Sequence, residues 1–306
     1  MTNGDNLDYE NREMILVVGA TGFLGAEICQ RLIAQGESVR GTVRATSDEH
    51  AMSRLRGLGV ETVQADLRDP ASLDAACVGV SAVVSTATTT RSRQPGDSIE
   101  ATDHAGQVAL VDAAARAGVS RFVYVSFSGQ IEQDSPLTRA KRAVEQRVRD
   151  SGMSFTILRP SYFMEVWLSP ALGFDPKNGT ATVYGDGTRP ISFISLSDVA
   201  SFAVAALRDP AAAGELLELG GPEPLTPLQV VRTFEEASGK PLAVQHVPVS
   251  ALEQQYAEAS DSLQQSFCGL MLDYARGDAI HMDAVQQRMP CALTSVREFA
   301  QASLRV

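Results

Sequence analysis

The sequence predicts an α/β fold in which a doubly wound parallel sheet is followed by a smaller α+β part. Short apolar runs alternate with amphipathic helical stretches from Met14 onward. This alternation is typical of βαβ units, because parallel strands need a crossover element between them. A glycine-rich turn separates the first strand from the first helix, and after Pro160 the alternation weakens while Gly and Pro become frequent.

The individual elements follow from periodicity and from start and stop signals. Residues 1–13 lack apolar periodicity and are expected to form a flexible tail. Helices are expected between the strands, with Asp-Pro and Ser-Pro starts at 69–70 and 135–136 and a stop at Gly36. Later helices are expected at 198–207 and 226–238. The apolar runs predict strands at 14–18, 38–43, 60–65, 80–85, 121–126, 153–158 and 215–219.

The composition excludes several classes of protein. The 306 residues include 26 Lys or Arg and 37 Asp or Glu, for a formal net charge of −11. A nucleic-acid partner is not expected, because phosphate binding needs a concentrated basic face. No apolar run reaches the ~18 residues of a membrane span, so a membrane is not expected as a partner either. A polar start and four scattered cysteines favour a cytoplasmic protein.

The strongest functional signal is GATGFLG at residues 19–25, a GxxGxxG pattern. It directly follows the first strand and opens the first helix, as a dinucleotide-binding turn does. Glycines let the backbone approach a pyrophosphate, whose charge is bound by N–H groups at the helix N-terminus. We therefore predict a Rossmann NADP-binding domain over 14–160. A substrate-binding part is expected over 161–306, with segments near 191–219 returning to the main sheet.

The end of the second strand favours NADP(H) over NAD(H). An NAD site usually carries an acidic residue about twenty residues after the glycine motif, whereas this chain has Arg44. A guanidinium suits a 2′-phosphate, because it forms paired charge-assisted hydrogen bonds. Arg40 is a weaker candidate inside the strand, and the alternative for Arg44 is a solvated loop cation.

Two further segments follow predicted strands, at the edge where ligands of such sheets bind. Asp66 either accepts a hydrogen bond from the adenine amino group or caps a loop. The small hydroxyl residues at 85–89 suit close approach to a ribose or nicotinamide, and a polar turn is the alternative.

Six segments together resemble the atypical short-chain dehydrogenases, and most closely the NmrA-like NAD(P)-binding family: GATGFLG at 19–25, Arg44, ADL at 65–67, RFVYVS at 121–126, AKRAVE at 140–145 and LRPSYFME at 158–165. The chain also resembles the isoflavone-reductase and quinone-oxidoreductase relatives, over about residues 14–240. Residues from 250 onward carry no recognisable motif. The motifs and the resemblance place the cofactor on Gly19, Thr21, Gly22, Phe23, Leu24, Gly25, Arg44, Asp66, Leu67, Thr86, Ala87, Thr88, Ser126, Lys141, Pro160, Tyr162 and Phe163.

The chain departs from this family at the catalytic tyrosine. Typical members carry Tyr-x-x-x-Lys, in which the lysine lowers the pKa of the tyrosine and the phenol delivers a proton. Lys141 is kept, but Leu137 stands at the tyrosine position. The resemblance implies that Lys141 contacts the nicotinamide ribose or acts alone as general acid or base. The alternative is an exposed helix lysine paired with Glu145. Tyr162 can supply a phenol by family analogy, although its setting is more typical of a pocket wall.

We predict an NADPH-dependent oxidoreductase that passes a hydride to a small organic acceptor. A quinone or conjugated carbonyl fits best, because it can take its proton from water or from Lys141. The alternative is a non-catalytic NADP(H)-binding redox sensor that acts through a protein partner. A sugar epimerase is less favoured, since Leu137 supplies no base. The expected substrate-pocket residues are Ser128, Phe163, Met164, Trp167 and the stretch 169–190.

The assembly state and metal content are only weakly constrained. The four histidines share no ligand spacing, which predicts that the chain holds no metal. A monomer and a homodimer both fit the sequence.

Overall fold

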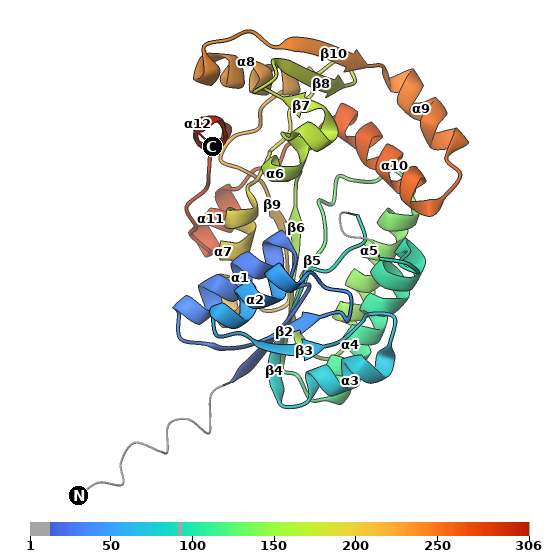
Figure 1. Cartoon of the computed structure of the whole chain (residues 1–306), viewed down its shortest axis with the longest axis vertical. Helices are drawn as coiled ribbons and strands as arrows, with labels where there is room; N and C mark the ends of the chain where they lie inside the picture. Colours follow the sequence, from blue (N-terminus) through green and yellow to red (C-terminus); the bar gives the residue numbers. More distant parts are fainter. Residues whose placement is uncertain (1–12, 91–93, 306) are drawn as a thin grey trace, which may run out of the picture.

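A seven-stranded parallel sheet forms the centre of the molecule (Figure 1). The computed structural model describes residues 13–90 and 94–305, so the tail predicted over 1–13 falls, except for Glu13, outside the described residues. The strands lie in the order β3-β2-β1-β4-β5-β6-β9, and neighbouring strands are parallel throughout. The chain starts in the middle of the sheet and winds toward both edges, which confirms the predicted doubly wound fold.

The strands follow the apolar runs of the sequence. Central strands are buried on both faces and therefore read as continuous apolar segments. The edge strand β3 has no fully buried side chain and is one residue shorter at each end than predicted. The strands are β1 (Met14–Val18), β2 (Ser38–Val43), β3 (Glu61–Gln64), β4 (Val80–Ser85), β5 (Arg121–Val125), β6 (Ser154–Pro160) and β9 (Glu215–Leu219).

Helices cover both faces of this sheet (Figure 1). One face packs against α1 (Phe23–Ala34) and α7 (Leu196–Arg208), with α2 (Glu49–Gly57) beside them. The other face packs against α3 (Pro70–Cys77), α4 (Gln107–Arg116) and α5 (Pro136–Arg149). The predicted starts of α3 and α5 are confirmed, because the side chains of Asp69 and Ser135 accept hydrogen bonds from N–H groups of the first helical turn.

A π-helix, η1 (Ile99–Gly106), precedes α4 and was not predicted. Such helices are rare and are frequent at functional sites. This one directs Thr102 toward the cleft described below and buries Asp103 completely.

The C-terminal part lies at one end of the main sheet and contains a three-stranded sheet in the order β10-β8-β7 (Figure 1). β10 is parallel to β8, and β7 is antiparallel to it. The core of the C-terminal part is rich in aromatic side chains, among them Trp167, Phe234 and Tyr274. Its elements are α6 (Met164–Trp167), η2 (Pro170–Leu172), β7 (Phe174–Asp175), β8 (Thr180–Tyr184), α8 (Pro227–Ser238), β10 (Ala243–Val247), α9 (Val249–Glu258), α10 (Ser262–Arg276) and α12 (Val296–Arg305). The short helix α11 (Asp283–Arg288) lies instead beside the main sheet, next to α7 and β9 (Figure 1).

The two parts of the chain are interleaved. After the three-stranded sheet has begun, the chain returns through α7 and the short helix η3 (Pro210–Ala212) to β9, which pairs with β6 and completes the main sheet. Across residues 13–90 and 94–305, no helix combines the length and apolar character that crossing a bilayer requires.

Candidate functional site

A cleft of about 560 Å³ crosses the carboxyl ends of the parallel strands. Residues that follow β1 through β6 form one side of it, and α5, α6 and α10 contribute to the other. Doubly wound sheets bind their ligands at this edge. Every residue predicted to bind the cofactor lines this cleft: Gly19, Thr21, Gly22, Phe23, Leu24, Gly25, Arg44, Asp66, Leu67, Thr86, Ala87, Thr88, Ser126, Lys141, Pro160, Tyr162 and Phe163.

The GATGFLG turn forms a closely packed backbone cradle at the start of α1. Gly19 has a φ of +90°, and a Cβ atom there would lie 2.8 Å from Thr86 Oγ1. A Cβ atom at Gly25 would lie 2.2 Å from the Gly19 carbonyl oxygen. Gly22 is the N-cap of α1, and no side chain of the described residues caps this helix. A helix that starts without a side-chain acceptor, against a glycine-rich turn, fits an anionic pyrophosphate.

Charged side chains gather where β2 and β3 end. Arg44 Nη1 donates to Asp97 Oδ2 at 2.7 Å, and Arg68 Nη2 donates to Asp66 Oδ2 at 2.7 Å. The hydrogen bond from Arg68 lowers the pKa of Asp66. Arg44 is therefore held in an ion pair and is not a solvated loop cation. Arg40, the weaker candidate, does not line the cleft.

Lys141 lies on the buried face of α5 and reaches the cleft. The residue is 6% exposed. Its Nζ donates to the Val125 carbonyl oxygen at 3.3 Å and lies 5.1 Å from the centre of the Tyr124 ring. Burial lowers the pKa of the amine, while the carboxylates of Asp103 and Glu145 oppose this change. The alternative of an exposed lysine paired with Glu145 is wrong.

Glu145 instead holds a buried network beside the cleft. It accepts hydrogen bonds from Ser126 Oγ at 2.6 Å, from Arg142 Nη1 at 2.6 Å and from Arg159 Nε at 3.0 Å. Burial alone would raise its pKa, but the hydrogen bonds from Arg159 and Ser126 and the charge of Arg142 hold the pKa below its ordinary value. The carboxylate therefore stays charged and fixes the Ser126 side chain at the wall of the cleft.

Tyr162 is part of the cleft wall. Its hydroxyl group donates to the Leu270 carbonyl oxygen at 3.1 Å, and burial raises its pKa well above the ordinary value. Its ring packs edge-on against Trp167, with 4.7 Å between the ring centres. Leu137, at the position of the family's tyrosine, is buried and also lines the cleft. Neither residue is placed to deliver a proton.

The structure corrects the predicted substrate wall. Phe163 and Trp167 line the cleft, but Ser128 and Met164 do not. Ser128 is fully buried and donates to Asp278 Oδ1 at 2.7 Å. Met164 is fully buried in the core of the C-terminal part, because α6 turns this side chain away from the sheet edge.

Residues 169–190 do not line the cleft either, because they form β7, β8 and their connections. Their predicted place is taken by α10, which contributes Phe267 and Leu270. The Phe267 ring stacks near-parallel on Trp167, with 6.4 Å between the centres. The spacing of Leu263, Phe267 and Leu270 is one face of a helix, and it was the available signal for this wall.

Comparison with known proteins shows the family to which this chain belongs. The sequence matches the model of the NmrA-like family over residues 11–299. The chain belongs to the NmrA-like family. The resemblance to this family that was inferred from the sequence motifs is therefore confirmed.

Individual relatives of this NmrA-like chain include reductases. It is 36% identical over 240 residues to a (4-alkanoyl-5-oxo-2,5-dihydrofuran-3-yl)methyl phosphate reductase of Streptomyces griseus, which covers 78% of each chain. It is 29% identical over 280 residues to an NAD(P)H azoreductase of Xenophilus azovorans, covering 90% of this chain and 92% of the relative. The NADPH-dependent quinone oxidoreductase QOR2 of Escherichia coli, solved in complex with NADPH, shares the fold with a TM-score of 0.76 at 21% identity, over 95% of this chain and all of that one.

Two buried carboxylates of this NmrA-like chain were not predicted. The side chain of Asp97 is 1% exposed, and Asp103 is fully buried. The Thr89 backbone N–H and hydroxyl group both donate to Asp103 Oδ2, at 3.1 and 2.5 Å. Both acids lie between β4 and α4, where no apolar periodicity marks a buried position, so only the folded chain shows their partners.

Proposed function

We propose that this chain is an NADPH-dependent oxidoreductase that reduces a small, uncharged conjugated acceptor by hydride transfer. The observation that carries the proposal is one continuous cleft, in which the glycine cradle and Arg44 are joined through the buried Lys141 to an aromatic wall. The Streptomyces griseus relative is named for the methyl phosphate ester of an oxo-dihydrofuran, a ring in which a double bond is conjugated to a carbonyl group. The conjugated ring of that substrate supports the proposal, whereas the proposed lack of charge rests on the residues of this chain alone. An acceptor of this electronic type, such as a quinone or a conjugated carbonyl, is proposed for this chain as well.

The cofactor has a partner for each of its charged parts. The start of α1 and the cradle from Gly19 to Gly25 would hold the pyrophosphate. Arg44 would hold the 2′-phosphate that distinguishes NADP(H) from NAD(H). The hydroxyl-bearing turn after β4 would lie along the nicotinamide half, because ligands cross the sheet edge there.

Apolar side chains of α6 and α10 line the acceptor half of the cleft. The residues that α6 and α10 contribute to it are Val166, Trp167, Phe267 and Leu270, and none of these four is charged. Trp167 lies near-parallel to Phe267 and to Tyr274, with interplanar angles of 12° and 17°. Stacked aromatic rings favour a planar ligand, and the absence of charged side chains among the residues that these two helices contribute to the cleft favours an uncharged one.

When bound, the nicotinamide supplies a hydride, and the acceptor needs one further proton to become the neutral reduced product. Lys141 is the residue placed to give that proton. Its ammonium group is buried at the cleft, and burial lowers its pKa, which makes it a stronger acid than an exposed lysine. Each turnover leaves a neutral amine that is reprotonated from solvent. General acid catalysis of this kind contributes about 10²- to 10⁴-fold to a rate.

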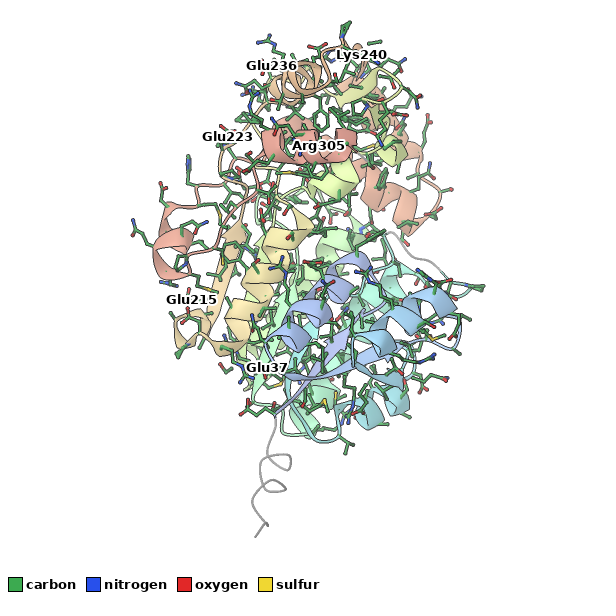
Figure 2. The ribbon with its side chains drawn as sticks, turned by 60° about the vertical axis from the view of Figure 1, so that its left-hand side comes forward. Glu37, Glu215, Glu223, Glu236, Lys240 and Arg305 are labelled. Atoms are coloured by element: carbon green, nitrogen blue, oxygen red, sulfur yellow. The ribbon has the colours of Figure 1, made fainter. Side chains whose placement is uncertain are left out.

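Lys141→Met tests the proposal, because methionine keeps the length of the side chain and removes the proton. NADPH oxidation is followed without oxygen against quinones, conjugated carbonyls and azo compounds. We expect the wild-type chain to reduce at least one of these acceptors, and Lys141→Met to lower kcat by about a hundredfold at saturating cofactor. The matched control is Lys240→Met, which alters an exposed lysine at the far end of the C-terminal part (Figure 2).

Two results would count against the proposal in different ways. Unchanged turnover by Lys141→Met would remove the lysine from proton transfer. Tight NADPH binding by the wild-type chain without turnover of any acceptor would favour the non-catalytic redox sensor instead.

A further inference from the structure

Two ion pairs lie next to each other where β2 and β3 end, and they form a four-charge cluster of Arg44, Asp66, Arg68 and Asp97. Arg44 bonds Asp97 and Arg68 bonds Asp66, each at 2.7 Å. Arg68 Nε also lies 3.5 Å from Asp97 Oδ1, which links the two pairs. A hollow of about 410 Å³ between Arg44, Asp66 and Arg68 opens beside the main cleft. The formal charges of this cluster cancel.

The Asp97 side chain is buried and held in place within this cluster. Its side chain is 1% exposed, and the Gln94 backbone N–H donates to the same oxygen, Oδ2, at 2.8 Å. Its other oxygen, Oδ1, is buried without a hydrogen-bond partner among the described residues. The neighbouring backbone is packed as well, since a Cβ atom at Gly96 would lie 2.6 Å from Arg68 Nη1. The carboxylate is therefore held against Arg44 and shielded from water.

We propose that Asp97 limits the preference of this cleft for NADPH over NADH. This inference rests on the proposed cofactor site. NADPH differs from NADH by its 2′-phosphate alone, and Arg44 is the residue proposed to bind that group. A carboxylate on the same guanidinium takes one of its donors and repels the phosphate, and little water screens it. The wild-type chain should accordingly bind both reduced cofactors, with only a modest preference for NADPH.

Asp97→Asn separates the effect of the charge from the effect of positioning. Asparagine keeps a carbonyl oxygen that can accept from Arg44, so the guanidinium stays in place while the negative charge is lost. If Asp97 acted only by orienting Arg44, removal of its charge would leave NADPH binding unchanged or weaken it. If the charge opposes the phosphate, the same change strengthens NADPH binding.

The experiment measures Kd for NADPH and NADH at one fixed ionic strength by titration calorimetry. We expect Asp97→Asn to tighten NADPH binding by about tenfold and to change NADH binding by less than about twofold. Asp97→Ser, a second neutral variant, should shift the ratio in the same direction, which protects the test if either variant folds poorly. Asp134→Asn is the matched control, because Asp134 pairs with Arg139 at the surface, outside the cleft.

An unchanged or reduced NADPH-to-NADH affinity ratio in folded Asp97→Asn and Asp97→Ser would overturn the inference. That result differs from a failure of the proposed cofactor site, in which the wild-type chain would bind neither cofactor, and from a failure of the proposed reduction, in which the wild-type chain would bind NADPH without turning over any acceptor.

Discussion

A single methyl group at Gly25 tests the backbone cradle. The added Cβ atom of Gly25→Ala would lie 2.2 Å from the carbonyl oxygen of Gly19, 2.7 Å from its carbonyl carbon and 3.0 Å from Ala20 Cα. Non-bonded carbon atoms prefer separations of about 3.5–4.0 Å. All three neighbours are backbone atoms, so no side-chain rotation can relieve the contact. The start of α1 must therefore move away from the turn by roughly 1 Å.

The size of the effect follows from two opposing terms. In an open helix, Gly→Ala stabilises by about 0.8–1.0 kcal/mol. Overpacking a closely packed site costs about 1–3 kcal/mol. For Gly25→Ala we therefore expect a net loss of up to about 2 kcal/mol in the free energy of unfolding. Gly57→Ala is the matched control, because Gly57 is also helical and a Cβ atom there would meet nothing within 4 Å.

Urea denaturation measures the stability of both variants, and calorimetry measures their affinity for NADPH. Gly25→Ala should bind NADPH at least about tenfold more weakly, because the N–H groups at the start of α1 move away from the pyrophosphate. Gly57→Ala should bind like the wild-type chain. Wild-type affinity in folded Gly25→Ala would refute the claim that this turn cradles the cofactor.

Two further variants test the buried network and the cleft wall. Glu145→Gln removes the buried carboxylate that pairs with Arg159. Urea denaturation should therefore show a loss of about 3 kcal/mol in the free energy of unfolding at neutral pH. Glu49→Gln, the control, alters an exposed ion pair and should change this free energy by less than about 0.5 kcal/mol. The pKa of Glu145 is lowered in the folded chain, so its contribution is present above the ordinary value of 4.5 and is lost as the pH falls through the folded value. A urea midpoint that falls as steeply below about pH 4.5 in Glu145→Gln as in the wild-type chain would contradict this assignment. Tyr162→Phe should keep kcat within about threefold, because the hydroxyl group already donates to a backbone carbonyl of α10; a hundredfold loss would identify Tyr162 as the proton donor.

The first half of the fold could be predicted because local patterns decide it. The strands at 14–18, 38–43 and 80–85 end where predicted, since most of their side chains are buried between the helix layers and form short runs that are mainly apolar. The glycine turn marks the site for the same reason: its conformation and close approach depend on residue type alone. β6 continues two residues beyond its predicted end, through Arg159 and Pro160, because its pairing with β9 extends that far.

The acceptor half of the site could not be predicted from local patterns. β7, β8 and β10 have two to five residues, too few to show a clear alternation. Phe267 and Leu270 could be assigned to a helix face, but only the packing of α10 shows that this face meets the cleft. For the same reason the stretch 169–190 was assigned to the wall wrongly.

Local sequence patterns also could not predict the partners of the buried charged residues. AKRAVE at 140–145 suggests a helix with Lys141 and Glu145 on one face, and an i,i+4 ion pair is the local expectation. In the structure, α5 packs on the sheet and buries Lys141. Glu145 instead accepts a hydrogen bond from Arg159, a residue of β6. The partner of Asp97 is likewise distant in sequence, since it pairs with Arg44, which follows β2.

Calorimetric titration of the wild-type chain with NADPH and NADH shows whether the cleft binds a nicotinamide dinucleotide. We expect saturable binding of one molecule of NADPH per chain, with a Kd in the roughly micromolar range, and weaker binding of NADH. Absence of a binding signal from both nucleotides at millimolar concentration would contradict the cofactor site, and the proposed reduction would then have no hydride donor.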